Sequence, residues 1–86
     1  LLFYSTNAPH TPLQFPPGTE DKFDPIADPK RRSYAAMMEQ FDREVGQIRA
    51  RVRALGQEDN TLIFYFSDNG GPGPTDAGAA NGANNG

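Results

Sequence analysis

The chain has 86 residues, 36% of them hydrophobic, and a formal net charge of −3. This length allows at most one small domain with a thin core. The negative charge argues against a general nucleic-acid or anionic-membrane binder, and no apolar run approaches the roughly 20 residues of a membrane span. The chain has no Cys, which excludes disulfides, zinc–thiolate sites and cysteine nucleophiles within these residues and leaves the redox compartment open.

The first expected element is a buried strand at residues 1–6. Its sequence, LLFYST, is short, apolar and aromatic, and it leads into Asn7, Ala8 and Pro9. This combination is typical of a strand that ends in a proline-containing loop. A proline-rich connection over residues 7–28 follows, and connections of such length are usually functional or disordered.

The next expected element is a helix over about residues 29–55. Asp28 and Pro29 suit a helix start, and Gly56 suits a helix end. Apolar side chains recur at alternating steps of four and three residues, which places them on one stripe of the helix. The stripe consists of Tyr34, Met38, Phe41, Val45, Ile48, Val52 and Leu55. We expect it to pack on the chain's own sheet, although the same spacing fits a coiled-coil seam.

A second strand is expected over residues 61–67. It contains the unbroken apolar run LIFYF, which is typical of a strand covered on both faces. Strand, long helix and strand together predict an α/β fold with a βαβ unit and a right-handed crossover. Residues 68–86 are rich in glycine and asparagine, and we expect them to form a loop.

Three polar residues follow the two expected strands. His10, the only histidine, comes after the first strand, and Asp68 and Asn69 come directly after the second. Because parallel strands end at the same edge of a sheet, these residues could face one cleft. The oxygen donors of Asp68 and Asn69 suit Ca²⁺ or Mg²⁺, although two donors need further ligands from elsewhere.

Each of these residues also has a simpler interpretation. The sequence Asp-Asn-Gly-Gly has the composition of an ordinary tight turn, and the local sequence favours that interpretation. A single histidine in a loop is most often an ordinary polar residue. Pro9 and Pro12 would stiffen the backbone around His10, which suits a positioned side chain without establishing one.

Four segments of the chain resemble the type I sulfatases, and they occur in that family's order. They are NAPHTPLQ (7–14), RRSYAAMME (31–39), DNTLI (59–63) and SDNGG (67–71). The similarity is closest to the arylsulfatase B-like branch, which acts on sulfated sugars. The resemblance implies an alkaline-phosphatase-like fold with a mixed sheet, of which residues 1–86 would be a partial catalytic domain.

The resemblance also implies a chemistry. Type I sulfatases hydrolyse aryl or carbohydrate sulfate esters with a formylglycine nucleophile and Ca²⁺, which is expected here in preference to Mg²⁺. Asp68 and Asn69 match the family's metal ligands, and His10 matches the histidine that contacts the sulfate ester near its leaving oxygen. The formylglycine motif, C/S-x-P-S/A-R, is missing, as are two further Asp ligands and a Lys. We therefore expect the nucleophile to lie outside this internal piece, and we expect the isolated chain to be inactive.

Two alternatives remain open at this point. A phosphatase or phosphonate hydrolase of the same superfamily would have a different nucleophile and additional metal-binding His and Asp residues. A non-catalytic, sulfatase-like binding protein would use only the loop surfaces. The resemblance is compatible with a periplasmic, extracellular or lysosomal location.

Overall fold

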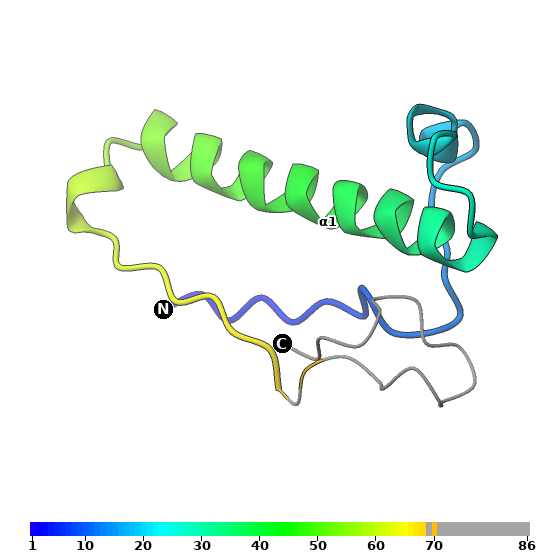
Figure 1. Cartoon of the computed structure of the whole chain (residues 1–86). Coiled ribbons are helices and arrows are strands. Elements are labelled where there is room, and N and C mark those ends of the chain that lie inside the picture. Colours follow the sequence, from blue (N-terminus) through cyan, green and yellow to red (C-terminus); the bar gives the residue numbers. More distant parts are fainter. Residues whose placement is uncertain (69, 71–86) are drawn as a thin grey trace.

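The structure is a computed structural model that describes residues 1–68 and 70. The described elements are η1 (Thr19–Phe23), α1 (Pro29–Ala54) and η2 (Glu58–Asn60), in that order. The long helix α1 dominates the molecule, and two extended segments, residues 1–6 and residues 61–67, run beneath it (Figure 1). The loop expected over residues 68–86 lies outside the described residues, apart from Asp68 and Gly70.

The limits of α1 follow from local sequence signals. At its start, the side chain of Asp28 accepts a hydrogen bond from the backbone N–H of Lys30 at 3.0 Å, and Pro29 occupies the first turn. At its end, Gly56 has a φ of 67°, which favours glycine. The N–H groups of Gly56 and Gln57 donate to the carbonyls of Arg53 and Val52, as in a Schellman motif. The helix expected over about residues 29–55 is therefore present as Pro29–Ala54.

The described part of the chain has a very small core. Ala36 and Met37 are its only buried hydrophobic residues. The predicted apolar stripe of α1 is half-buried from Tyr34 to Val52, and Leu55 at its end is 57% exposed. The stripe therefore has only partial cover from the rest of the described chain.

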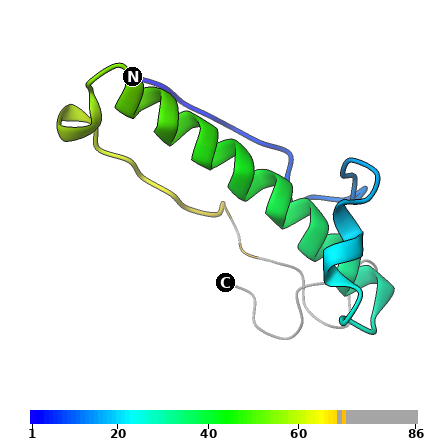
Figure 2. The same cartoon turned by 90° about the horizontal axis from the view of Figure 1, so that it is seen from above.

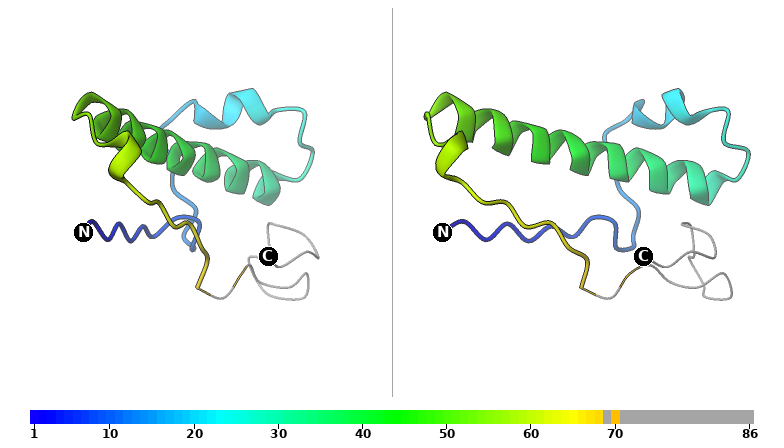
Figure 3. Two further views of the ribbon diagram at one scale, coloured as in Figure 1. Left: turned by 90° about the vertical axis from the view of Figure 1, so that its left-hand side faces the viewer. Right: turned by 60° about the vertical axis from the view of Figure 1, so that its left-hand side comes forward.

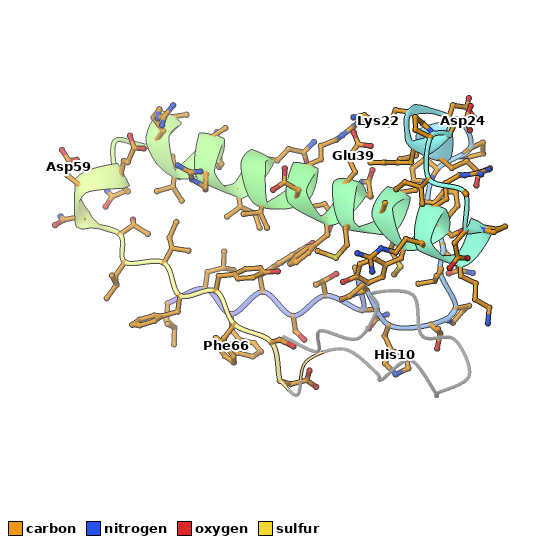
Figure 4. All side chains as sticks on the ribbon, in the orientation of Figure 1. His10, Lys22, Asp24, Glu39, Asp59 and Phe66 are labelled. Carbon is orange, nitrogen blue, oxygen red and sulfur yellow. The ribbon has the colours of Figure 1, made fainter. Side chains whose placement is uncertain are left out.

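A polar cluster attaches η1 to the first half of α1. Lys22 Nζ, in η1, donates to Glu39 Oε1, and Arg43 Nη2 lies 3.2 Å from the same oxygen. Figure 4 shows Lys22 and Glu39 close together at one end of the molecule. The Glu39 side chain is 18% exposed, and the hydrogen bond from Lys22 lowers the pKa of this carboxyl below its ordinary value. Charged contacts thus join η1 to α1 in a chain with few buried apolar residues.

The two predicted strands are absent from the part of the chain that the structure describes. Residues 1–6 and 61–67 are extended but do not form strands within the described chain. Both run beneath α1, from its Ala54 end toward its Pro29 end, and in the view from above one falls on each side of the helix axis (Figures 1 and 2). Strands form only when backbone N–H and C=O groups pair with a neighbour, and these two segments do not pair with each other. The α/β expectation of a βαβ unit is therefore not confirmed, and the described chain is helical.

The lack of pairing leaves much apolar surface on the two segments uncovered. Phe66, for example, is 76% exposed, and its side chain points away from α1 (Figure 4). The exposed large side chains are Leu1, Leu2, Phe3 and Tyr4 in the first segment, and Leu62, Ile63, Phe64, Tyr65 and Phe66 in the second. The views of Figure 3 show both segments on the same side of α1, opposite its outer face. The prediction that 61–67 is covered on both faces is therefore not confirmed within the described chain.

No helix within residues 1–68 and 70 combines the length and apolar character that crossing a membrane requires.

Candidate active site

His10 lies in a compact turn directly after the first extended segment. The backbone N–H of His10 donates to the carbonyl of Asn7 at 2.7 Å, and the N–H of Ala8 donates to Thr6 Oγ1 at 3.2 Å. The His10 side chain is exposed, and it points away from α1 (Figure 4). The turn thus presents His10 to solvent on the side of the molecule that faces away from the helix.

The hydrogen bonding of the His10 ring gives its two nitrogens different roles. Nδ1 lies 2.7 Å from the backbone carbonyl of Thr11. Because a carbonyl oxygen can only accept, Nδ1 carries the proton and donates it to this bond. In the neutral ring, Nε2 is then the nitrogen that accepts a proton, and in the imidazolium it is the nitrogen that donates one. His10 can therefore deliver a proton or a hydrogen bond from Nε2 to a ligand oxygen.

The second extended segment also ends in a turn. Ser67 Oγ accepts a hydrogen bond from the backbone N–H of Gly70 at 3.0 Å, and Gly70 has a φ of 72°. Asp68 is the first residue inside this turn, and it is exposed. This hydrogen bond joins the residues on either side of Asp68 and Asn69, and the Asp68 side chain is exposed there. Asn69, the second predicted metal ligand, lies outside the described residues.

The segments that precede His10 and Asp68 run in the same general direction beneath α1 (Figures 1 and 2). Within the described residues, however, no group of three or more His, Asp or Glu side chains could hold a metal ion. A Ca²⁺ ion takes about six to eight oxygen ligands. Asp68 has the right chemistry for such an ion, but the described residues alone do not complete a site.

A shallow hollow lies next to the His10 turn. It has a volume of about 350 Å³ and is lined by Thr11, Leu13, Pro29, Lys30 and Ser33. Neither His10 nor Asp68 lines this hollow. The convergence of His10, Asp68 and Asn69 on one cleft stays a prediction.

Two contacts that the sequence analysis missed connect the extended segments to α1. Tyr4 Oη donates to Glu44 Oε2 at 2.7 Å, and the hydrogen bond to Glu44 raises the pKa of the Tyr4 hydroxyl. Tyr65 stacks on Phe41 with ring centroids 5.9 Å apart and an angle of 29° between the planes. Phe41 belongs to the predicted stripe, so its place on the packing face of the helix was foreseeable from periodicity. The contact of Glu44 with Tyr4 was not foreseeable, because nothing in the local sequence pairs residues so far apart.

Comparison with known proteins identifies the family. The sequence model of the sulfatase family matches residues 1–85. The chain belongs to the sulfatase family. This confirms the resemblance that the four motifs indicated, and the family implies an alkaline-phosphatase-like fold for the whole domain. No solved structure matches the chain.

Curated sulfatases are similar over most of the chain. Arylsulfatase J of Mus musculus is 35% identical over 79 residues, which is 92% of this chain and 13% of the relative. Arylsulfatase G of Mus musculus is 37% identical over 71 residues, 81% of this chain and 12% of the relative. An uncharacterized sulfatase of Escherichia coli is 34% identical over 71 residues, 81% of this chain and 13% of the relative. The chain thus spans 12–13% of the length of these relatives.

Proposed function

We propose that this chain is part of a sulfatase that hydrolyses aryl or carbohydrate sulfate esters. The observation that carries the proposal is the family match over residues 1–85. The names of the relatives, arylsulfatase J and arylsulfatase G, support the same reaction class. The two turns add support, because each presents an exposed polar side chain, that of His10 or Asp68, at the end of an extended segment.

In this proposal His10 acts on the leaving group. Nδ1 is held by the Thr11 carbonyl, so the ring presents Nε2. From Nε2 the ring donates a proton or a hydrogen bond to the alkoxide oxygen that departs from sulfur. A histidine suits this role because its imidazole ring can both accept and donate a proton.

Asp68 and Asn69 would supply oxygen ligands to Ca²⁺. Carboxylate and amide oxygens are hard donors, which suit Ca²⁺ in a site that further ligands from the rest of the domain complete. When bound, the cation offsets the charge on the sulfate oxygens. The nucleophile, a formylglycine, is assigned to a position outside these 86 residues, which contain no Cys.

The ligand role is tested by substituting Asp68 in the intact sulfatase. Asp68→Ala should lower turnover and raise the Ca²⁺ concentration for half-maximal activity by more than about tenfold, because loss of even an outer-shell partner can cost that much affinity. The measurement is hydrolysis of an aryl sulfate over a Ca²⁺ titration. Asp59→Ala is the matched control, because Asp59 is an exposed carboxylate in η2 at the far end of the molecule (Figure 4). An unchanged Ca²⁺ requirement in Asp68→Ala would contradict the role.

The role of His10 is tested through the leaving group. General acid catalysis contributes about 10²- to 10⁴-fold, and it matters most when the leaving alkoxide is basic. His10→Ala should therefore slow sugar or alkyl sulfates far more than activated aryl sulfates, measured as kcat/KM over a series of leaving groups. His10→Gln keeps a hydrogen-bond donor, and its kcat/KM should fall between those of the wild type and His10→Ala. An equal loss on all substrates would refute this assignment.

The same assays separate the sulfatase from its rivals. Hydrolysis of aryl phosphate without hydrolysis of aryl sulfate would indicate a phosphatase or phosphonate hydrolase. Absence of both activities, together with an inert residue at the nucleophile position, would indicate a sulfatase-like binding protein.

A further inference from the structure

Two side-chain contacts attach the extended segments to a single turn of α1. Tyr4, in the first segment, bonds to Glu44 on α1, forty residues further along the chain. Tyr65, in the second segment, stacks on Phe41 of the same helix. Residues three apart in a helix are neighbours on its surface, so Phe41 and Glu44 form one attachment point.

Each contact lies just before one of the two candidate site turns. Tyr4 precedes the turn that presents His10, and Tyr65 precedes the turn that presents Asp68. Within the described residues no backbone ladder joins the two segments, so no hydrogen-bond register between them sets their offset. Both segments run beneath α1 (Figures 1 and 3), which is capped at both ends and offers them a common support.

The chemistry of the two contacts suits the attachment of the segments to α1. The Tyr4 hydroxyl donates to a carboxylate, and such charge-assisted hydrogen bonds are shorter and stronger than neutral ones. Gln40 Nε2 lies 3.5 Å from the other oxygen of Glu44, so the carboxylate has partners on both sides. The Phe41 and Tyr65 rings are stacked at a centroid separation of 5.9 Å, which lies within the range that aromatic pairs favour.

We propose that Tyr4, Glu44, Phe41 and Tyr65 are positioning residues, which fix the two extended segments to one turn of α1 and so set where His10 and Asp68 stand relative to each other. The catalytic consequence rests on the proposed sulfatase function. The positional claim stands on the contacts alone, and it is tested separately.

The positional claim can be tested by a distance measurement on the chain itself. The chain has no Cys, so spin labels can be attached only at introduced cysteines, Thr11→Cys beside His10 and Phe66→Cys beside Asp68. Double electron–electron resonance between the two labels should give one narrow distance distribution when no other residue is changed. Tyr4→Phe removes only the hydroxyl, and Phe41→Leu removes the ring stack but keeps an apolar side chain, and either should broaden or shift the distribution.

Matched controls separate a lost contact from a general loss of order. Tyr34→Phe removes a hydroxyl from α1 that makes no hydrogen bond within the described residues, and Phe15→Leu removes a ring without a stacking partner there. Both should leave the distance distribution unchanged, and circular dichroism at 222 nm should show that all variants retain α1. A broad distribution in the parent, or no response to Tyr4→Phe and Phe41→Leu, would overturn the proposal.

The catalytic consequence is tested in the intact sulfatase by measuring how the loss of each contact changes kcat and the Ca²⁺ requirement. Tyr4→Phe should lower kcat by roughly tenfold on poor leaving groups and little on activated aryl sulfates, as expected for a displaced His10, since misplacement by about 1 Å can cost up to about 10²-fold. Phe41→Leu should instead raise the Ca²⁺ concentration for half-maximal activity, as expected for a displaced Asp68. A uniform loss on all substrates with no change in Ca²⁺ dependence would refute positioning.

A double-mutant cycle completes the test. Glu44→Ala should lower kcat as much as Tyr4→Phe does. The double variant should lose no more activity than either single variant, because both substitutions remove the same contact. Glu44→Gln keeps an acceptor oxygen and should retain most of the activity. Additive losses would contradict the proposal. If the intact protein hydrolyses no sulfate ester, the proposed function fails while the distance measurement still decides the positional claim.

Discussion

At the scale of single residues, charged contacts link neighbouring elements of a chain that buries little apolar surface. Glu39 is the clearest case, because its Oε1 receives both Lys22 from η1 and Arg43 from the next turn of α1. Arg53 and Glu58 form a similar two-pronged contact between α1 and η2, at 2.8 and 3.0 Å. In both pairs the hydrogen bond from the basic side chain lowers the pKa of the glutamate, so both contacts depend on an ionised carboxyl.

The contact between η1 and α1 should therefore weaken in acid. The pKa of Glu39 is lower in the folded chain than its ordinary value of 4.5, so the stabilisation is present above pH 4.5 and is lost as the pH falls through the folded value. Amide chemical shifts of η1 in NMR spectra, followed from pH 7 to pH 2, should move toward unfolded values in this range. Glu39→Gln should remove this acid-induced change in the chemical shifts of η1. Asp42→Asn is the control, since exposed Asp42 makes no ion pair in the described chain, and an unchanged acid step in Glu39→Gln would contradict the assignment.

At the scale of elements, the helix could be predicted and the strands could not, for one physical reason. Every signal for α1 is local, namely the cap at Asp28, the apolar period and the stop at Gly56. The apolar run LIFYF indicates only that residues 62–66 can be covered on both faces. Whether they pair depends on neighbours that the run does not specify. The structure shows the segment extended and unpaired within the described chain.

Gly46 is a local weak point in α1 that can be tested directly. It lies in the helix interior, is exposed, and a Cβ built on it would meet nothing within 4 Å. Gly46→Ala should therefore stabilise the helix by about 1 kcal/mol, through the lower backbone entropy of alanine in the unfolded chain. The measurement is thermal unfolding followed by circular dichroism at 222 nm. Ala50→Gly, at another exposed helix position, should destabilise by a similar amount, and a destabilised Gly46→Ala would show that another group approaches this position.

At the scale of the whole molecule, the sequence predicted the family and the order of the site residues better than it predicted their arrangement. The motifs around His10 and Asp68 were enough to indicate a sulfatase, because a family motif is a linear pattern. The turns that present them were also foreseeable, since prolines flank His10 and glycine follows Asp68 and Asn69. The attachment of Tyr4 to Glu44 could not be predicted, because a contact across forty residues depends on the path of the chain between them.

The same reasoning predicts where backbone protection is missing. The interior amides of α1 are bonded within the helix, whereas the amides of residues 62–66 have no backbone partner in the described chain. In hydrogen exchange of the isolated chain, amides of α1 should exchange slowly and those of 62–66 at nearly unprotected rates. Because unpaired backbone is costly only when it is buried, and large apolar side chains favour burial, the same amides should become protected in the intact sulfatase, where neighbouring chain can pair with them and cover Phe64 and Phe66. Slow exchange of 62–66 in the isolated chain would show that a ladder forms without those neighbours, and continued fast exchange in the intact protein would show that the segment never joins a sheet.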